Sequence, residues 1–274
     1  MTNMKSNSIL ALGFLLFLLI FSHPSSTQAQ EVEDEREFDY ARGGPIGPEK
    51  WGEIKKEWSL CSYGTMQSPI DLSSKKVDKV VNYDKQYRNY KPSNASLTNR
   101  GHDITLQWEG DAGSILVGYT EYALKQVHWH SPSEHTINGR IYDMEIHLVH
   151  LSIDNRIAVI AVLYNIGIPN DFLSKLEINI ASLIDQKSKR VHGGMVDPKD
   201  IRMSTRWYYG YIGSLTVPPC TEDVLWIISR KILTVSRAQV KLLREAVNDY
   251  AEHNARPIQP DNKRDILFYG PASK

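Results

Sequence analysis

Short runs rich in β-branched and aromatic residues recur along the chain, and most are bounded by glycine, proline, asparagine or aspartate. Runs of this length and composition are typical of the strands of a sheet. They predict strands over residues 104–108, 114–117, 124–130, 144–150, 157–164 and 224–229. The polar stretch 92–99 is interpreted instead as a surface loop.

Helical signals are fewer. Asn170 can cap a segment whose apolar residues fall on one helical face, namely Phe172, Leu173, Leu176, Ile180 and Leu183. Ser236 and Gln239 have the spacing of a capping box that opens a helix over residues 237–251. The apolar face of that second helix consists of Val240, Leu243, Ala246 and Val247. The whole pattern predicts a β-rich α+β domain with helices around the sheet.

The first 29 residues differ in pattern from the rest. Lys5 precedes a run of thirteen apolar or small residues over 9–21, and small and polar residues follow up to Ala29. This arrangement is typical of a secretory signal peptide. A membrane anchor is the alternative, but thirteen residues at helical rise are too short for a hydrocarbon core of about 30 Å. We therefore expect a signal peptide over 1–29, a loose acidic arm over 30–37 and one domain over 38–270.

Net charge narrows the choice of partners. The 274 residues carry a formal net charge of zero, and Lys5 is the only charged residue of the predicted signal peptide, so the mature chain carries −1. A near-neutral chain has no general electrostatic attraction for nucleic acid or for an anionic membrane. We therefore expect no nucleic-acid partner. Because the sequence has no second apolar run like 9–21, we also expect no membrane anchor after processing.

Cys61 and Cys220 are the only cysteines. In an oxidising compartment such a pair predicts one disulfide, closing a loop of about 160 residues and contributing roughly 4–5 kcal/mol to stability. The alternative is two unrelated buried thiols. The only glycosylation sequon is Asn94-Ala95-Ser96, which makes Asn94 a candidate for N-glycosylation.

The predicted strand 124–130 contains the sequence Gln126-Val127-His128-Trp129-His130. Alternate side chains of a strand share a face, so Gln126, His128 and His130 project to the same side. Two imidazoles at this spacing can reach one metal ion. A lone His-x-His pair is nevertheless a weak signal, because histidines also occupy strand faces for ordinary packing reasons.

A second predicted strand, 144–150, strengthens the metal hypothesis. Its alternation places Glu145, His147 and Val149 on one face and His150 on the other. If the two strands are neighbours, His147 supplies a third ligand. Three histidines with an open fourth position are typical of catalytic zinc, whereas structural zinc usually has four ligands rich in cysteine.

Two polar residues on these strands are candidates to orient the ligands. Gln126 and Glu145 each lie two residues from a proposed ligand and on the same face. A metal-bound histidine normally donates its other ring N–H to such a group. A solvent-facing carboxylate is the alternative for Glu145, but its apolar neighbours disfavour that interpretation.

Several short motifs, in the same order along residues 38–270, resemble those of the α-carbonic anhydrase family. They are GPEKW at 47–51, QSPID at 67–71, NRGH at 99–102, QVHWH at 126–130, SEHT at 133–136, EIHLVH at 145–150, GSLTVPPC at 213–220 and NARPIQP at 254–260. Each motif alone is a weak signal, but together and in this order they are highly specific. The resemblance implies one domain with a large, twisted, mainly antiparallel sheet, peripheral helices and a zinc ion at the bottom of a funnel.

The resemblance also implies roles for individual residues. His128, His130 and His147 match the zinc ligands, and Gln126, Glu145 and the backbone of Asn254 match their outer partners. Thr216 matches the hydroxyl that accepts the proton of zinc-bound hydroxide, and Glu134 matches the carboxylate that orients this hydroxyl. His102 matches the histidine that relays protons to bulk buffer. The apolar wall for carbon dioxide matches Val149, Val159, Leu215 and Trp226. Cys61 and Cys220 match the disulfide of secreted members, and Tyr40 a tyrosine of the ordered-water network, although its spacing to Trp51 differs slightly from that of animal enzymes.

One departure from the family pattern concerns the substrate pocket. The family often has two threonines where this chain has Thr216 and Val217. Valine is nearly isosteric with threonine but lacks its hydroxyl, so one hydrogen-bonding group near the substrate is missing. We expect altered turnover and altered affinity for bicarbonate or inhibitors, with the chemistry retained.

The resemblance therefore predicts a secreted zinc enzyme that hydrates carbon dioxide to bicarbonate and is inhibited by sulfonamides, in extracellular fluid or in a plastid reached by the secretory route. The acidic arm also resembles that of plant members, including dioscorins and nectarins, so a storage or nectar protein with monodehydroascorbate reductase activity is the alternative. No dinucleotide-binding motif supports such redox chemistry. A zinc hydrolase would need a carboxylate as general base, and the resemblance assigns the nearest one, Glu134, to Thr216 instead.

Overall fold

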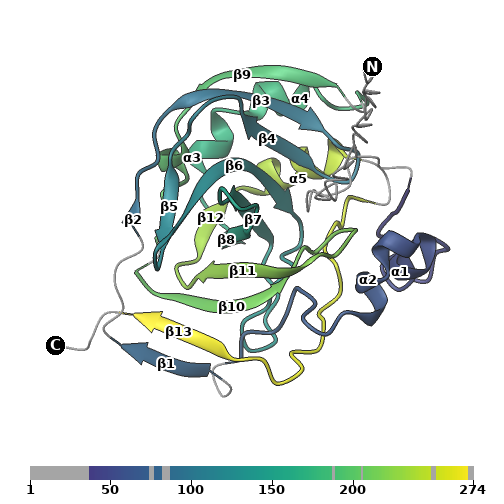
Figure 1. The fold of residues 1–274 in the computed structure, drawn as a ribbon. Coiled ribbons are helices and arrows are strands. Elements are labelled where there is room, and N and C mark those ends of the chain that lie inside the picture. The colour runs from purple at the N-terminus through teal and green to yellow at the C-terminus, as the bar shows by residue number, and fades with distance from the viewer. Residues whose placement is uncertain are drawn as a thin grey trace, which may run out of the picture.

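One large sheet organises the part of the chain that the structure describes (Figure 1). The computed structural model describes residues 37–73, 77–81, 87–186, 189–204, 206–247 and 251–270. The predicted signal peptide over 1–29 and the acidic arm up to residue 36 lie outside these residues. Among the described helices, none has both the length and the apolar composition needed to cross a membrane.

The sheet has thirteen strands, most of them antiparallel. They are β1 (Val77–Val81), β2 (Tyr87–Arg88), β3 (Ser93–Asn99), β4 (Ile104–Trp108), β5 (Ser114–Val117), β6 (Thr120–His130), β7 (Met144–Leu151), β8 (Ile157–Ile166), β9 (Arg190–Val196), β10 (Tyr208–Ser214), β11 (Glu222–Ser229), β12 (Leu233–Val235) and β13 (Ile266–Gly270). The main path runs β1-β13-β10-β11-β8-β7-β6-β4-β3-β9, with β12 beside β8, β5 beside β6 and β2 beside β5. Among the strand pairs of the described residues, only β1–β13, β8–β11 and β8–β12 are parallel. The predicted fold class is confirmed.

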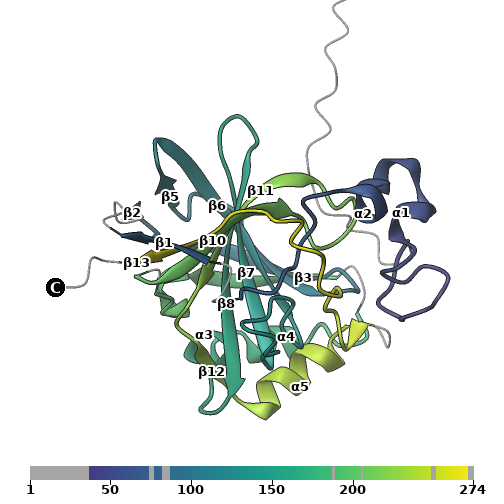
Figure 2. The ribbon, with the colours of Figure 1, turned by 90° about the horizontal axis from the view of Figure 1, so that it is seen from below.

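The helices are short and lie at the edges of this sheet. The α-helices are α1 (Trp51–Ile54), α2 (Leu60–Tyr63), α3 (Asp171–Ser174), α4 (Glu177–Ala181) and α5 (Arg237–Glu245), and the 3₁₀ helices are η1 (Lys56–Trp58) and η2 (Pro198–Ile201). Figure 1 shows α3, α4 and α5 on the side of β7 and β8 that faces β9, and in Figure 2 they lie around the lower ends of these strands. Their apolar residues pack with Ile146, Leu148 and Ile160 in one core cluster. A second cluster, on the other face of the same strands, includes Val149 and Val159.

The helix predicted after Asn170 is two helices in the structure. The cap is as predicted, because the Asn170 side chain accepts a hydrogen bond of 3.1 Å from the Leu173 N–H. The Leu176 N–H then bonds the Leu173 carbonyl three residues back, at 2.8 Å. This 3₁₀-type turn separates α3 from α4. The predicted apolar residues are buried on both helices.

The predicted capping box of α5 is present, with Ser236 and Gln239 bonded reciprocally at 3.1 Å. The helix ends at Glu245 and not at 251 as predicted. The Ala246 carbonyl accepts a 2.5 Å hydrogen bond from the Asn99 side chain, so a tertiary contact satisfies the end of the helix. Residues 248–250 lie outside the described residues.

The stretch 92–99 is not the surface loop that its polarity predicted. It forms β3, which pairs with β4 on one side and β9 on the other. Ala95 and Leu97 alternate into the core, and the small polar residues between them hid this period of two. The Asn94 side chain is exposed, so the sequon lies on a strand and not on a loop.

Candidate metal centre

The register of β6 and β7 brings three histidines together. His128 lies directly opposite His147 in this antiparallel pair, and His130 is two residues further along the same face of β6. The ring centroids lie 5.1 Å apart for His128 and His130, 5.1 Å for His128 and His147 and 4.6 Å for His130 and His147. One nitrogen from each ring lies within 4.8 Å of the other two. All three side chains are buried.

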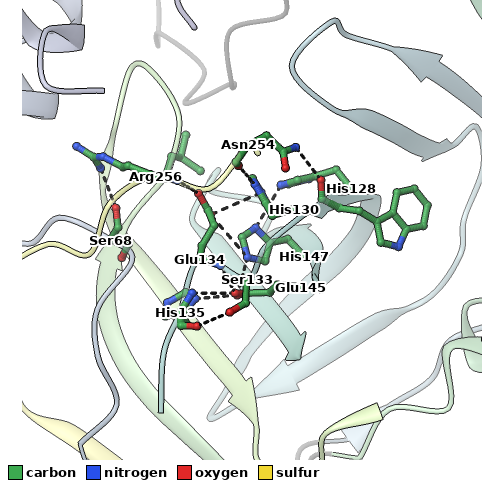
Figure 3. A network of polar contacts seen from close by, with 12 residues as sticks. Ser68, His128, His130, Ser133, Glu134, His135, Glu145, His147, Asn254 and Arg256 are labelled. Carbon is green, nitrogen blue, oxygen red and sulfur yellow. Dashed lines mark hydrogen bonds and ion pairs between the residues drawn. The ribbon is translucent and has the colours of Figure 1, made fainter. Parts of the chain in front are cut away.

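A different acceptor fixes each ring, and Figure 3 shows those of His130 and His147. Nδ1 of His128 lies 2.9 Å from the Gln126 side-chain oxygen, and Nδ1 of His130 lies 2.7 Å from the Asn254 carbonyl oxygen. In His147 the two ring nitrogens have the opposite roles, because the nitrogen fixed by the protein is Nε2, which lies 2.8 Å from Glu145 Oε1. The nitrogens that face one another are therefore Nε2 of His128 and His130 and Nδ1 of His147.

The protonation state of these rings suits a metal ligand. Burial lowers the pKa of both His128 and His130 well below the usual value, so both rings are neutral at pH 7. Nε2 of His130 is buried and makes no hydrogen bond to any described residue. A buried nitrogen lone pair without a donor is costly, and a cation at this point would remove that cost. The donor set therefore fits a divalent ion that prefers imidazole, such as Zn²⁺.

Glu145 is held by more groups than the sequence indicated. Its Oε2 accepts hydrogen bonds from the backbone N–H groups of Glu134, at 2.9 Å, and His135, at 2.8 Å. Its Oε1 contacts His147 and, at 2.7 Å, Nδ1 of His135. Burial alone would raise the pKa of Glu145, but the imidazoles of His135 and His147 lower it well below the usual range. A fixed carboxylate of this kind keeps the ring of His147 in one orientation.

His135 is the residue of this site to which sequence reasoning gave no role. Its Nε2 lies 2.7 Å from the Tyr211 hydroxyl, which also contacts the Ser68 hydroxyl at 2.7 Å. His135, Glu145 and His147 form a second group with metal-ligand spacing. Both ring nitrogens of His135 are engaged by neighbours, so this group is a hydrogen-bonded network and not a second ion site. The motif SEHT was the only signal for it in the sequence.

Glu134 lies beside the histidines and is buried. Its Oε1 accepts a hydrogen bond of 2.9 Å from the Arg256 backbone N–H, and its Oε2 lies 3.6 Å from Nε2 of His130. Burial raises the pKa of Glu134 to about 8, and the Thr216 hydroxyl is among the groups that oppose this shift. A divalent cation at the three histidines would favour the ionised carboxylate further.

His102 lies in the turn between β3 and β4 and is only 2 % exposed. Its ring centroid is 4.9 Å from that of Phe38, and its Nε2 is 3.7 Å from the Asp103 carboxylate. Its backbone carbonyl accepts a 2.9 Å hydrogen bond from Asn254, the residue that also contacts His130. Tyr40 packs nearby, with its ring 5.5 Å from Trp51.

Four of the five residues expected in the substrate pocket, those of the apolar wall, belong to one buried cluster. They are Val149, Val159, Leu215 and Trp226. The Trp226 ring centroid is 4.9 Å from that of His147, so this cluster borders the histidines. Val217, the fifth, packs in the neighbouring cluster with Trp51 and Cys220.

The predicted disulfide between Cys61 and Cys220 is confirmed, with sulfur atoms 2.05 Å apart. It joins the α1–α2 region to the segment that carries Thr216. Arg256 supports the same junction, because its guanidinium donates hydrogen bonds to the carbonyls of Cys61, at 2.9 Å, and Ser68, at 2.8 Å.

Comparisons with known proteins agree with this geometry. The sequence profile of the family described as eukaryotic-type carbonic anhydrase matches residues 46–270. Carbonic anhydrase Nec1 of Nesocodon mauritianus is 51% identical over 267 residues, which are 96% of each chain. The crystal structure of a dioscorin complexed with ascorbate has a TM-score of 0.85 and 43% identity, covering 87% of this chain and 100% of the other. The α-carbonic anhydrase of Thermovibrio ammonificans in complex with the inhibitor sulfanilamide has a TM-score of 0.76 and 35% identity, covering 84% and 98%.

Proposed function

Because the chain belongs to the α-carbonic anhydrase family, we propose that it is a zinc enzyme catalysing the reversible hydration of carbon dioxide to bicarbonate and a proton. The observation that carries the proposal is the convergence of one buried nitrogen from each of His128, His130 and His147. Zinc held by these three rings supplies a Lewis acid that lowers the pKa of water, an effect for which carbonic anhydrase is itself the reference example. Three neutral ligands leave the double charge of the ion undiminished.

The proposed roles of the protein groups follow from their contacts. Gln126, Glu145 and the Asn254 carbonyl accept hydrogen bonds from the ligand histidines and hold the three rings in place. Glu134, once ionised, accepts a hydrogen bond from the Thr216 hydroxyl and so leaves the Thr216 oxygen as an acceptor toward the reacting water. This arrangement selects the orientation in which the reactive lone pair of the water faces carbon dioxide.

Substrate selection depends on the apolar wall. Val149, Val159, Leu215 and Trp226 present carbon and no charge, and their cluster borders His147. Carbon dioxide has no net charge and gains from apolar contact, whereas bicarbonate is charged and is better solvated by water. The wall therefore favours entry of the substrate and departure of the product. The sulfanilamide complex of the Thermovibrio ammonificans relative supports aromatic sulfonamides as inhibitors that occupy the same space.

His102 is proposed to move the product proton toward bulk buffer. An imidazole with an ordinary pKa near 6.5 can both accept and release a proton at neutral pH. Since His102 is buried against Phe38, the relay requires ordered water or a rotation of the ring between the site and solvent. His102→Ala is expected to slow turnover and to be rescued by imidazole buffer. Equal rates with and without His102 would remove this role.

The experiment for the whole proposal is a carbon dioxide hydration assay combined with metal analysis of the purified mature chain. We expect about one zinc per chain and hydration that an aromatic sulfonamide abolishes. The control is the chain with Thr216→Ala, which keeps all three ligand rings and should retain zinc while losing most activity. A zinc-containing wild-type chain with no hydration activity would overturn the proposal.

A second candidate function rests on the similarity to the dioscorin complexed with ascorbate. In that case the chain would be a storage or nectar protein with monodehydroascorbate reductase activity. The two functions differ in what the histidines do, since only hydration requires the ion. Ascorbate-dependent activity that survives complete removal of zinc would favour the second function.

Export from the cell is also proposed. The residue pattern of 1–29 supports a signal peptide, and the Cys61–Cys220 disulfide is typical of an oxidising compartment. Asn94 is the proposed attachment site for N-linked sugar, with its side chain exposed on β3. A glycosidase-dependent mass shift that Asn94→Gln abolishes would test the attachment.

A further inference from the structure

One cavity of the described structure lies away from the histidine site. It is a cavity of about 180 Å³ lined by Arg88, Tyr90, Pro198, Lys199, Arg202 and Met203. Arg88 ends β2, and Pro198 and Lys199 belong to η2. Figure 1 shows β2 on the opposite side of the molecule from α1 and α2. A single water needs only about 10–15 Å³ of such a cavity, so a small organic molecule has room here.

The cavity is rich in positive charge. Arg88, Lys199 and Arg202 all line it, and only Arg202 has a carboxylate partner among the described residues, Asp171 at 2.8 Å. Arg88 is half-buried, and neither its guanidinium nor the Lys199 ammonium makes a hydrogen bond or ion pair with any described side chain. Lys199 is exposed, whereas Arg88 is partly withdrawn from solvent. Like charges that line one cavity repel each other, and a bound anion would relieve that repulsion.

The carboxylates near the cavity are already engaged. Asp200 pairs with Lys175 at 2.6 Å, which lies outside the cavity lining. Asp197 accepts a hydrogen bond of 2.9 Å from the Lys199 backbone N–H and so caps η2. Asp171 contacts Arg202 through side chains that are mostly exposed, and solvent weakens a pair of this kind. Counted over the described residues, the lining of the cavity therefore has an excess of positive charge.

The remaining lining of the cavity is largely apolar. Tyr90 and Pro198 are buried, and Met203 is half-buried. Nδ1 of His150 lies 3.2 Å from the Ala158 carbonyl and donates to it, so Nε2 accepts a hydrogen bond of 2.7 Å from the Tyr90 hydroxyl. The two rings also stack, with centroids 5.9 Å apart. Because its hydroxyl is committed to His150, Tyr90 offers the cavity an aromatic surface and not a donor.

We propose that this cavity binds a small doubly charged oxyanion joined to an apolar group, that is, an organic phosphate or a dicarboxylate. The Arg88 guanidinium has the planar fork that pairs with two oxygens of such a group, and Lys199 adds a second positive charge. The apolar part of the ligand packs on Tyr90 and Met203. Bicarbonate does not fit this description, because it carries one charge and no apolar part.

Calorimetric titration of the zinc-loaded mature chain with inorganic phosphate and with succinate, at low ionic strength, tests the site. We expect saturable binding of at least one of the two anions, with Arg88→Gln weakening it about tenfold and Lys199→Gln about threefold, as loss of one charge-assisted contact predicts. Binding of phosphate alone identifies a phosphate ligand, and binding of succinate alone identifies a dicarboxylate.

Lys56→Gln is the matched control. It removes the same charge from the exposed surface of η1, on the far side of the molecule, and should leave both affinities within about twofold of wild type. Hydration activity should be unchanged in all three variants, so this test does not depend on the proposed catalytic function. No saturable binding of either anion to the wild-type chain, or equal weakening by Lys56→Gln and Arg88→Gln, would overturn the proposal.

Discussion

The strand β7 carries two buried histidines, three residues apart, with opposite surroundings. His147 faces β6 and its two histidines, whereas His150 points to the other face of the sheet. Both ring nitrogens of His150 are satisfied within the protein, by Tyr90 and by Ala158. In the group around His147, each ring is fixed through one nitrogen and the other nitrogens converge.

Burial alone therefore does not distinguish a ligand histidine from a structural one. Burial lowers the pKa of His150 to about 4 and that of His128 and His130 well below the usual value, so all of these rings are neutral at pH 7. The distinction lies in the second nitrogen. Where the protein supplies a partner for it, the ring is part of the core. Where it does not, as at Nε2 of His130, the ring is prepared for a ligand.

The largest expected effect comes from removing a converging ring. His130→Ala deletes one of three ligands, so zinc should be lost and hydration should fall more than about a hundredfold, since loss of a mere outer partner costs 10–100-fold. Metal analysis and kcat/KM for hydration measure this. His150→Gln is the matched control and should keep one zinc per chain. Full zinc content and activity in His130→Ala would show that His130 is not a metal ligand and does not differ from His150 in this respect.

The second-largest expected effect is on the free energy of unfolding and its dependence on pH, through His150. Because its folded-state pKa is about 4, the unfolded chain takes up a proton below pH 6.5 that the folded chain does not. The contribution of His150 to the free energy of unfolding is therefore fully present above pH 6.5. It is lost as the pH drops from about 6.5 to about 4, and the loss amounts to about 3 kcal/mol. His150→Gln should be less stable at pH 7 and should lose this part of the pH dependence.

Urea unfolding of the zinc-free chain at pH 7 and pH 5 measures that difference. His253→Gln is the control, because the His253 side chain is exposed. An unfolding free energy with the same pH dependence in wild type and His150→Gln would show that His150 is not held neutral by burial.

The third prediction concerns the groups that orient the ligand histidines. Gln126→Ala removes the acceptor of the His128 Nδ1–H and should weaken zinc binding about 10–100-fold while leaving the fold intact. Gln107→Ala is the matched control, because Gln107 lies directly opposite Gln126 on β4 and is exposed. Competition with a chelator gives both affinities. Equal affinities in the two variants would mean that His128 needs no outer partner.

The smallest expected effect is at Val217. Val217→Thr adds a hydroxyl of nearly the same shape, and one net hydrogen bond corresponds to about a two- to tenfold change in affinity. We expect an aromatic sulfonamide to bind more tightly, with zinc content unchanged. An inhibition constant identical to wild type would show that position 217 does not reach the ligand.

The metal site could be predicted in large part because alternation along a strand determines which side chains share a face. His128, His130 and His147 needed only that rule and the assumption that their strands are neighbours, which the register of β6 and β7 meets. The Asn254 carbonyl lies 124 residues from His130 in the sequence, so only family resemblance could suggest it. The contacts of His135 with Glu145 and Tyr211 likewise depend on the folded structure.

The fold was predicted in part. The strands 104–108 and 114–117 have the predicted bounds, since the first alternates apolar residues with Thr105 and Gln107 and the second has three apolar residues in a row. The strands β9 and β10 were missed because Gly193, Gly194, Gly210 and Gly213 interrupt their apolar pattern. β3 was missed because its polar residues are small and its burial comes from two neighbouring strands.

Zinc-edge X-ray absorption of the purified mature chain tests the central claim most directly. The account predicts three nitrogen neighbours at about 2.0–2.1 Å, one further light atom exchangeable with a sulfonamide nitrogen, and no protein-bound zinc signal in His130→Ala. A sulfur neighbour at about 2.3 Å, or a fourth protein ligand that no inhibitor displaces, would contradict it.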